Sequence, residues 1–153
     1  MGFTINKVKQ ERLENQETIM SHGLDPWTLF TYAMKAPMTR DRYQTRVTKF
    51  FDYIGIQGAS TEKKARNFAT RSRKDSSWAF DCIIRFAYFQ KKRVDKKEIT
   101  GATVRNYVKS IKLFCEMADV RIQWKKVTRG LPRGRKYADD RIPTLDEIRK
   151  LVE

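Results

Sequence analysis

Apolar residues recur at helical spacing in several segments of this chain, and this periodicity constrains the fold more than any other feature. The clearest stripe lies in residues 39–54 and is followed by Gly55 and Gly58, which are expected to end the helix. Its members, at i, i+4, i+7, i+8 and i+11, are Tyr43, Val47, Phe50, Phe51 and Ile54. A repeat of this kind predicts a helix with one face in a hydrophobic core.

Two further helices are predicted directly after this segment. Ser60 or Thr61 can cap a helix that runs to about Lys74, and its narrow apolar face predicts a surface position. That face consists of Ala65, Phe68 and Ala69. Asp75 or Ser76 can cap the next helix, whose apolar residues cover well over half of its circumference and predict a buried central helix. They are Trp78, Ala79, Cys82, Ile83, Ile84, Phe86, Ala87 and Phe89.

A last long helix is predicted from Thr100, as its cap, to about Ala118. One face of it is apolar and is made by Val104, Tyr107, Val108, Ile111, Phe114, Cys115 and Ala118. A short helix is expected near the start of the core, with Asp25 as cap and Pro26 at the first helical position. No segment requires a strand, so the predicted fold class is all-α: a small bundle of four to five helices with short connections.

The predicted organisation has four parts: a polar tail at 1–24, the helical domain at 25–131, a basic linker at 132–142 and a terminal helix at 143–153. In the last part, Thr144 and Glu147 have the spacing of a capping box. An apolar stripe follows, formed by Leu145, Ile148, Leu151 and Val152. We expect this helix to open a further domain of a longer protein, or to dock on another chain.

Positive charge is concentrated in the middle of the chain. Residues 1–59 hold 8 Lys/Arg and 6 Asp/Glu, residues 60–136 hold 22 and 7, and residues 137–153 hold 3 and 5, within a formal net charge of +15. Such a concentrated field suits a phosphate polyanion better than a small acidic substrate. Nucleic acid is therefore the favoured partner over a merely solvated surface.

Several classes of chemistry are disfavoured by what the sequence lacks. His22 is the only histidine, glycine-rich phosphate loops are absent, and no apolar run approaches the length of a membrane span. We therefore expect no cofactor, no metal and no membrane or small-molecule partner. Cys82 and Cys115 fall on apolar helix faces, and no secretory signal is evident, which favours a reducing cytoplasmic location, with association to the nucleoid if the partner is DNA. A disulfide between them stays possible from sequence.

The helix at 100–118 carries the first candidate set of DNA contacts. Arg105, Lys109 and Lys112 lie at i, i+4 and i+7 beside the apolar face, where their cations can meet phosphates. Thr103 and Asn106, nearer the start of the helix, can reach base edges in the major groove.

Two other sets compete for the same role. On the helix from Thr61, Lys63, Asn67 and Lys74 share one face, and Asn67 is either an adenine contact or a solvated amide. The third set is expected on an extended stretch that follows the DNA backbone or acts as a charged hinge. It consists of Lys125, Lys126, Arg129, Arg133, Arg135 and Lys136.

Other polar and aromatic side chains are expected to be structural. Arg42, Arg46 and Lys49 form a stripe that we expect to be solvated, because Asp41 and Asp52 lie on the polar side of the same helix. Trp124 is expected to seal one end of the core.

Three segments of the chain resemble the core-binding domain of tyrosine recombinases, also called phage-type integrases. "TRDRYQTRVTKFFDYIG" at 39–55 is similar to the first core helix of that family, and "ITGATVRNYVKSIKLFCEMA" at 99–118 is similar to its last. "LPRGRKYADDRIPTLDEIRKLVE" at 131–153 resembles the linker into the catalytic domain. Integrase-like sequences of archaeal genomes look closest, and the basic helix at 60–74 is only loosely similar.

The resemblance implies a helical domain that forms half of a clamp around duplex DNA for site-specific integration or recombination. It also implies that the catalytic tyrosine, arginines, lysine and histidine lie outside this chain, so no residue here is expected to be catalytic. Leu113 and Met117, one turn apart, are a possible contact with other recombinase protomers on DNA. The alternatives are a free-standing DNA-binding regulator and, less favoured, a basic RNA-binding protein.

Overall fold

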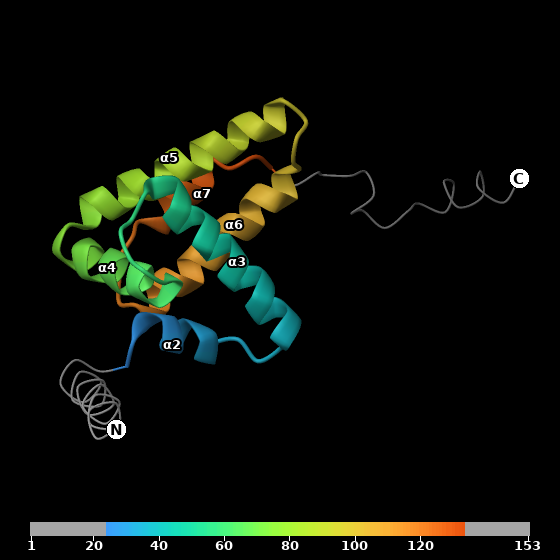
Figure 1. Ribbon diagram of the computed structural model, residues 1–153. Coiled ribbons are helices and arrows are strands. Elements are labelled where there is room, and N and C mark those ends of the chain that lie inside the picture. Colours follow the sequence, from blue (N-terminus) through green and yellow to red (C-terminus); the bar gives the residue numbers. More distant parts are fainter. Residues whose placement is uncertain (1–23, 134–153) are drawn as a thin grey trace, which may run out of the picture.

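The computed structural model describes residues 24–133, and within this part of the chain all regular structure is helical (Figure 1). Its six helices are α2 (Pro26–Tyr32), α3 (Pro37–Ile54), α4 (Thr61–Lys74), α5 (Ser76–Asp95), α6 (Gly101–Met117) and α7 (Trp124–Arg129). The predicted all-α fold class is confirmed. Most of the expected tail and linker, and the whole expected terminal helix, lie outside the described residues.

Side-chain caps begin four of these helices where the sequence predicts them. The Asp25 carboxylate accepts the N–H of Thr28 and the Ser60 hydroxyl accepts that of Lys63. Asp75 and Thr100 cap α5 and α6 by accepting the N–H groups of Trp78 and Thr103. The other two helices have no side-chain cap: α3 starts at Pro37 after Ala36, which has no capping group, and α7 follows Gln123.

The centre of the bundle is α6, which packs against α3, α2 and α5 (Figure 1). Its Phe114 is fully buried and contacts four other aromatic rings at centroid distances of 5.4 to 6.4 Å. These rings belong to Trp27, Phe30, Phe51 and Phe68. One aromatic side chain therefore joins α2, α3 and α4 to α6.

The prediction that the helix after Asp75 is the buried centre is wrong. Only one side of α5 is covered, and Tyr88 and Phe89 are exposed. The width of an apolar face does not decide how much of it a helix buries. Here α3, α4 and α6 cover the side of Ala79, Ile83 and Phe86, while Trp78 and Phe80 are half-buried beside it.

The expected surface position of α4 agrees with its narrow buried face, in which Phe68 is completely covered. The stretch after Ile122, in contrast, was expected to be extended and is partly helical. Val127 is buried and anchors α7 beside α5, while Trp124 is half-buried against the core, as predicted. A six-residue helix held by one buried valine has too little periodicity to be recognised from sequence.

Candidate nucleic-acid interface

The described residues carry a large excess of positive charge that is mostly not neutralised by nearby carboxylates. Residues 24–133 contain 25 Lys/Arg and 10 Asp/Glu. Within this part of the chain three ion pairs form: Lys64–Asp52 at 2.9 Å, Arg66–Asp25 at 3.4 Å and Arg93–Glu98 at 3.0 Å. Most of the 25 Lys/Arg side chains are therefore outside these ion pairs, and their arrangement on the surface decides where a polyanion can bind.

Three cations form a continuous line along the solvent side of α6. Arg105, Lys109 and Lys112 are all exposed, and we call them the α6 edge. The opposite side of the helix is fixed in the core, so the edge stands on a rigid support. Glu116, one turn after Lys112, is the first carboxylate along this line.

Arg105 also ties α6 to the segment that follows α7. Its Nε donates a hydrogen bond to the carbonyl oxygen of Pro132 at 2.9 Å. This contact uses one of the five N–H donors of the guanidinium group. The side chain is thus oriented while most of its donors stay available to a phosphate.

Thr103 and Asn106 do not lie in line with the α6 edge. Thr103 is half-buried on the side of α6 that faces α3, and its hydroxyl lies 3.1 Å from that of Thr100. Asn106 is half-buried as well. The structure therefore separates these two polar residues from the cations with which the sequence grouped them.

The α4 set is only partly placed for a ligand. Lys63 and Lys74 are exposed, but the Nδ2 of Asn67 donates to the carbonyl oxygen of Gln57 at 2.7 Å. Asn67 therefore fastens the loop between α3 and α4, and a bidentate adenine contact would have to break this bond.

The arginines of α4 have internal partners too. Besides the ion pair of Arg66, the Arg71 guanidinium lies 4.0 Å from the ring centre of Trp78, and Arg73 Nε donates to the carbonyl oxygen of Ala118 at 2.8 Å. The α4 helix uses its cations for packing more than α6 does.

The third set is divided by the structure. Lys125, Lys126 and Arg129 lie on α7, which corrects the expectation of an extended stretch, because burial of Val127 stabilises a helical turn there. Lys125, Arg129 and Arg133 are exposed. Arg135 and Lys136 lie outside the described residues.

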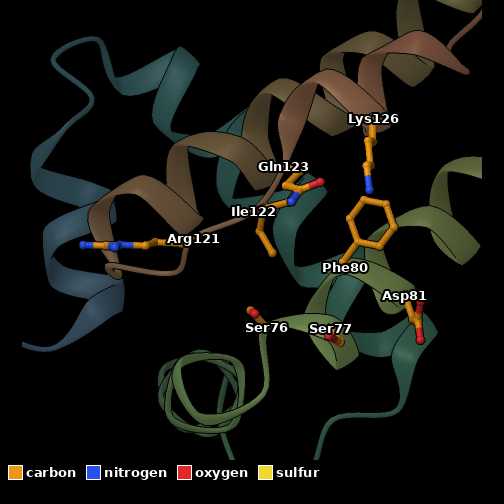
Figure 2. Close-up of a pocket in the computed structure, with 8 residues that line it drawn as sticks. All are labelled: Ser76, Ser77, Phe80, Asp81, Arg121, Ile122, Gln123 and Lys126. Carbon is orange, nitrogen blue, oxygen red and sulfur yellow. The ribbon is translucent and has the colours of Figure 1, made fainter.

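Lys126 lines a pocket of about 290 Å³ between the start of α5 and the segment before α7. Figure 2 shows its side chain directed at the ring of Phe80, while Arg121 points away from the other labelled residues. Ser76, Ser77, Asp81 and Gln123 complete the polar lining.

A basic groove was missed by sequence reasoning. It measures about 330 Å³ and lies between α3 and the first turns of α6. Its lining residues are Asp41, Arg42, Thr45, Arg46, Lys49, Thr103 and Tyr107. Three cations face a single carboxylate here, since Asp52 is turned to Lys64. Asp52 lies three residues after Lys49, a neighbouring position on the helix, so only its ion pair with Lys64 on α4 separates the two, and the sequence of α3 holds no signal of it.

The described residues hold little else that suggests chemistry. Both cysteines are free thiols, which excludes the disulfide left open by the sequence. No group of three or more His, Cys, Asp or Glu residues between 24 and 133 could hold a metal ion. None of the helices in that range combines the length and apolarity needed to cross a membrane.

Leu113 and Met117 are both half-buried, and Leu113 packs against the core. A larger core than the sequence outlined covers part of this pair, which leaves less apolar surface for a partner.

Comparison of the chain with known protein families, curated proteins and solved structures finds no match.

Proposed function

We propose that this chain is a duplex-DNA-binding domain, and specifically the core-binding domain of a site-specific tyrosine recombinase or integrase that forms half of a clamp on the recombination site. The observation that supports DNA binding most is the α6 edge, three exposed cations in line on a helix whose other side is buried. The assignment to recombinases rests on the resemblance of residues 39–55, 99–118 and 131–153 to that family.

The α6 edge has dimensions that suit a duplex. Seven residues of helix separate Arg105 from Lys112, a rise of about 10 Å. The major groove is roughly 12 Å wide and accepts a helix, whose long cationic side chains then reach the phosphates on its walls. Because the edge carries no carboxylate before Glu116, it repels no phosphate along this length.

We assign a positioning role and no bond cleavage to this domain. Tyr107 is buried and packed edge-on against Phe86 at 5.3 Å, so its hydroxyl group is poorly placed to attack a phosphodiester. Tyr43 is half-buried, with the Arg46 guanidinium 5.6 Å from its ring centre. Both rings serve packing in the bundle.

Some of these observations also fit two other functions. A free-standing DNA-binding regulator would use the same α6 edge, and the two are distinguished by whether the domain works joined to a catalytic domain. An RNA-binding protein would explain the charge, and exposed aromatic residues on α3 and α5 favour contact with unpaired bases. We assign those residues to a separate surface below.

A competition assay tests the proposal. A labelled DNA duplex is bound to the chain, and unlabelled duplex DNA or duplex RNA of equal length is added. We expect duplex DNA to displace the label at a concentration about tenfold lower than duplex RNA, because the narrow, deep major groove of A-form RNA excludes a helix. Equal displacement by duplex RNA would overturn the assignment to DNA.

A further inference from the structure

A pair of aromatic rings lies exposed where α3 ends beside the middle of α5. Tyr53 and Phe89 are 42% and 43% exposed, with their ring centres 5.0 Å apart. We call this pair the aromatic platform. Such rings are costly to leave in water, so a pair of them on the surface calls for an explanation.

The aromatic platform is held in place by a contact with the core and by a hydrogen bond to the backbone of α5. The ring of Tyr53 contacts buried Phe86 at 5.3 Å, and its hydroxyl donates to the carbonyl oxygen of Arg85 at 3.4 Å. The two rings are thus supported by the core and by the backbone of a long helix. Because the rings are ordered before a ligand binds, binding costs less side-chain entropy.

Cations flank the platform on both helices. On α3, Lys49 is one turn and Arg46 two turns before Tyr53, on the same side of the helix. On α5, Arg85 is one turn before Phe89 and Lys92 is one turn after it. The nearest carboxylate on this side of α5 is Asp81, about 12 Å from Phe89 along the helix axis.

The basic groove between α3 and α6 continues the same line. Arg46 and Lys49 belong both to its lining and to the stripe that leads to Tyr53. The cations of the groove and the rings of the platform therefore form one surface along α3. This surface is separate from the α6 edge, because Thr103 and Tyr107 line the groove from the other side of α6.

We propose that this surface binds single-stranded nucleic acid, with unpaired bases stacked on Tyr53 and Phe89 and the sugar-phosphate backbone along Lys49, Arg46 and Arg42. Proteins that bind single strands combine these two features, a positively charged groove and aromatic side chains that stack on bases. A protein partner would be expected to meet aliphatic residues around the rings. The residues one turn away on the same sides of the two helices, Lys49, Arg85 and Lys92, are instead exposed cations, and the exposed residue next to Phe89 is another aromatic one, Tyr88. The inference adds a second ligand to the duplex-binding domain and does not depend on the α6 edge.

The test measures binding of the whole chain to a labelled oligothymidine of about 20 nucleotides by fluorescence anisotropy, in parallel with a DNA duplex. The variant Tyr53→Leu/Phe89→Leu keeps an apolar cover but removes the aromatic faces. We expect its affinity for oligothymidine to fall about tenfold and its duplex affinity to stay within about twofold. The matched control is Tyr32→Leu on α2, which removes another exposed ring and should change neither affinity.

Three outcomes would overturn the proposal. The wild-type chain fails to bind oligothymidine while it binds the duplex, or the leucine variant, with an unchanged circular dichroism spectrum, binds oligothymidine as tightly as wild type. Alternatively, the wild-type chain dimerises and Phe89→Lys makes it monomeric in analytical ultracentrifugation, which would assign the platform to a second copy of the chain.

Discussion

The turn between α3 and α4 depends on the absence of a side chain at Gly58. A Cβ atom built there would lie 2.7 Å from the backbone nitrogen of Lys64, and the φ angle is +159°. We expect Gly58→Ala to lower the free energy of unfolding by about 1–3 kcal/mol. Gly130→Ala is the matched control, because nothing lies within 4 Å of its Cβ position and its φ is −86°, so it should be neutral or slightly stabilising. Urea denaturation of both variants measures the difference.

The two thiols should differ in reactivity. Burial raises the pKa of Cys115, which is fully covered, and the neighbouring Glu116 acts in the same direction. Burial also raises the pKa of Cys82, but Arg71 and Arg85 oppose the shift and the residue is only half-buried. A maleimide should therefore label Cys82 in the native state and Cys115 only after unfolding, as followed by mass spectrometry. Equal labelling of both thiols in the native state would contradict the buried position of Cys115.

Burial of Cys115 also predicts a pH dependence of stability. A thiol whose pKa is raised in the folded state stays protonated there, while the same thiol in the unfolded chain ionises above about pH 8.5. The contribution to stability is thus complete below that pH and is lost as the pH rises further. Unfolding free energies measured between pH 7.5 and 10 should fall more steeply for wild type than for Cys115→Ala. Parallel curves would indicate that the thiol does not contribute.

At the scale of single elements, α4 is attached to the bundle mainly by Phe68. This ring is fully buried and contacts Phe50, Phe51, Trp78 and Phe114. We expect Phe68→Ala to cost about 3–5 kcal/mol of stability, in the range of large-to-small changes in a core. Thr70→Ala, at an exposed position on the same helix, is the control and should change stability by less than about 0.5 kcal/mol. A small effect of Phe68→Ala in thermal unfolding would contradict this packing.

The sequence predicted the existence of the long helices better than their arrangement. Caps such as Asp75 and Thr100, together with apolar stripes, are local signals and were found where expected. That α6 rather than α5 is central depends on which faces meet in three dimensions, and no single stripe contains this information. The α7 helix was missed because Val127 is its one buried residue, which is too little for a recognisable apolar stripe.

In the candidate sites, too, the sequence predicted the features that depend on one helix and missed those that depend on neighbouring helices. Exposure of Arg105, Lys109 and Lys112 follows from their spacing beside an apolar face, and the structure places all three in solvent. The hydrogen bond from Asn67 to Gln57 and the separation of Thr103 from the α6 edge depend on neighbouring elements. For the same reason the groove between α3 and α6 could not be assembled from either helix alone.

At the scale of the whole molecule, basic residues are distributed over several faces, so charge alone does not locate a DNA-binding surface. Lys35, Lys91 and Lys96 are exposed, like the cations of the α6 edge, but they do not form a line on one helix. The proposal that α6 binds the duplex therefore depends on how the cations are arranged. Its test must compare variants that have the same total charge.

The measurement that tests this claim most directly is the salt dependence of duplex binding for wild type and two charge-matched variants. If about 6 to 8 phosphates are neutralised, the slope of log affinity against log salt should be near −5 to −7. Replacing Arg105, Lys109 and Lys112 with alanine should reduce its magnitude by roughly 3, whereas alanine at Lys35, Lys91 and Lys96 should reduce it by less than about 1. Equal reductions in the two variants, or an unchanged slope when the α6 edge is removed, would contradict the account.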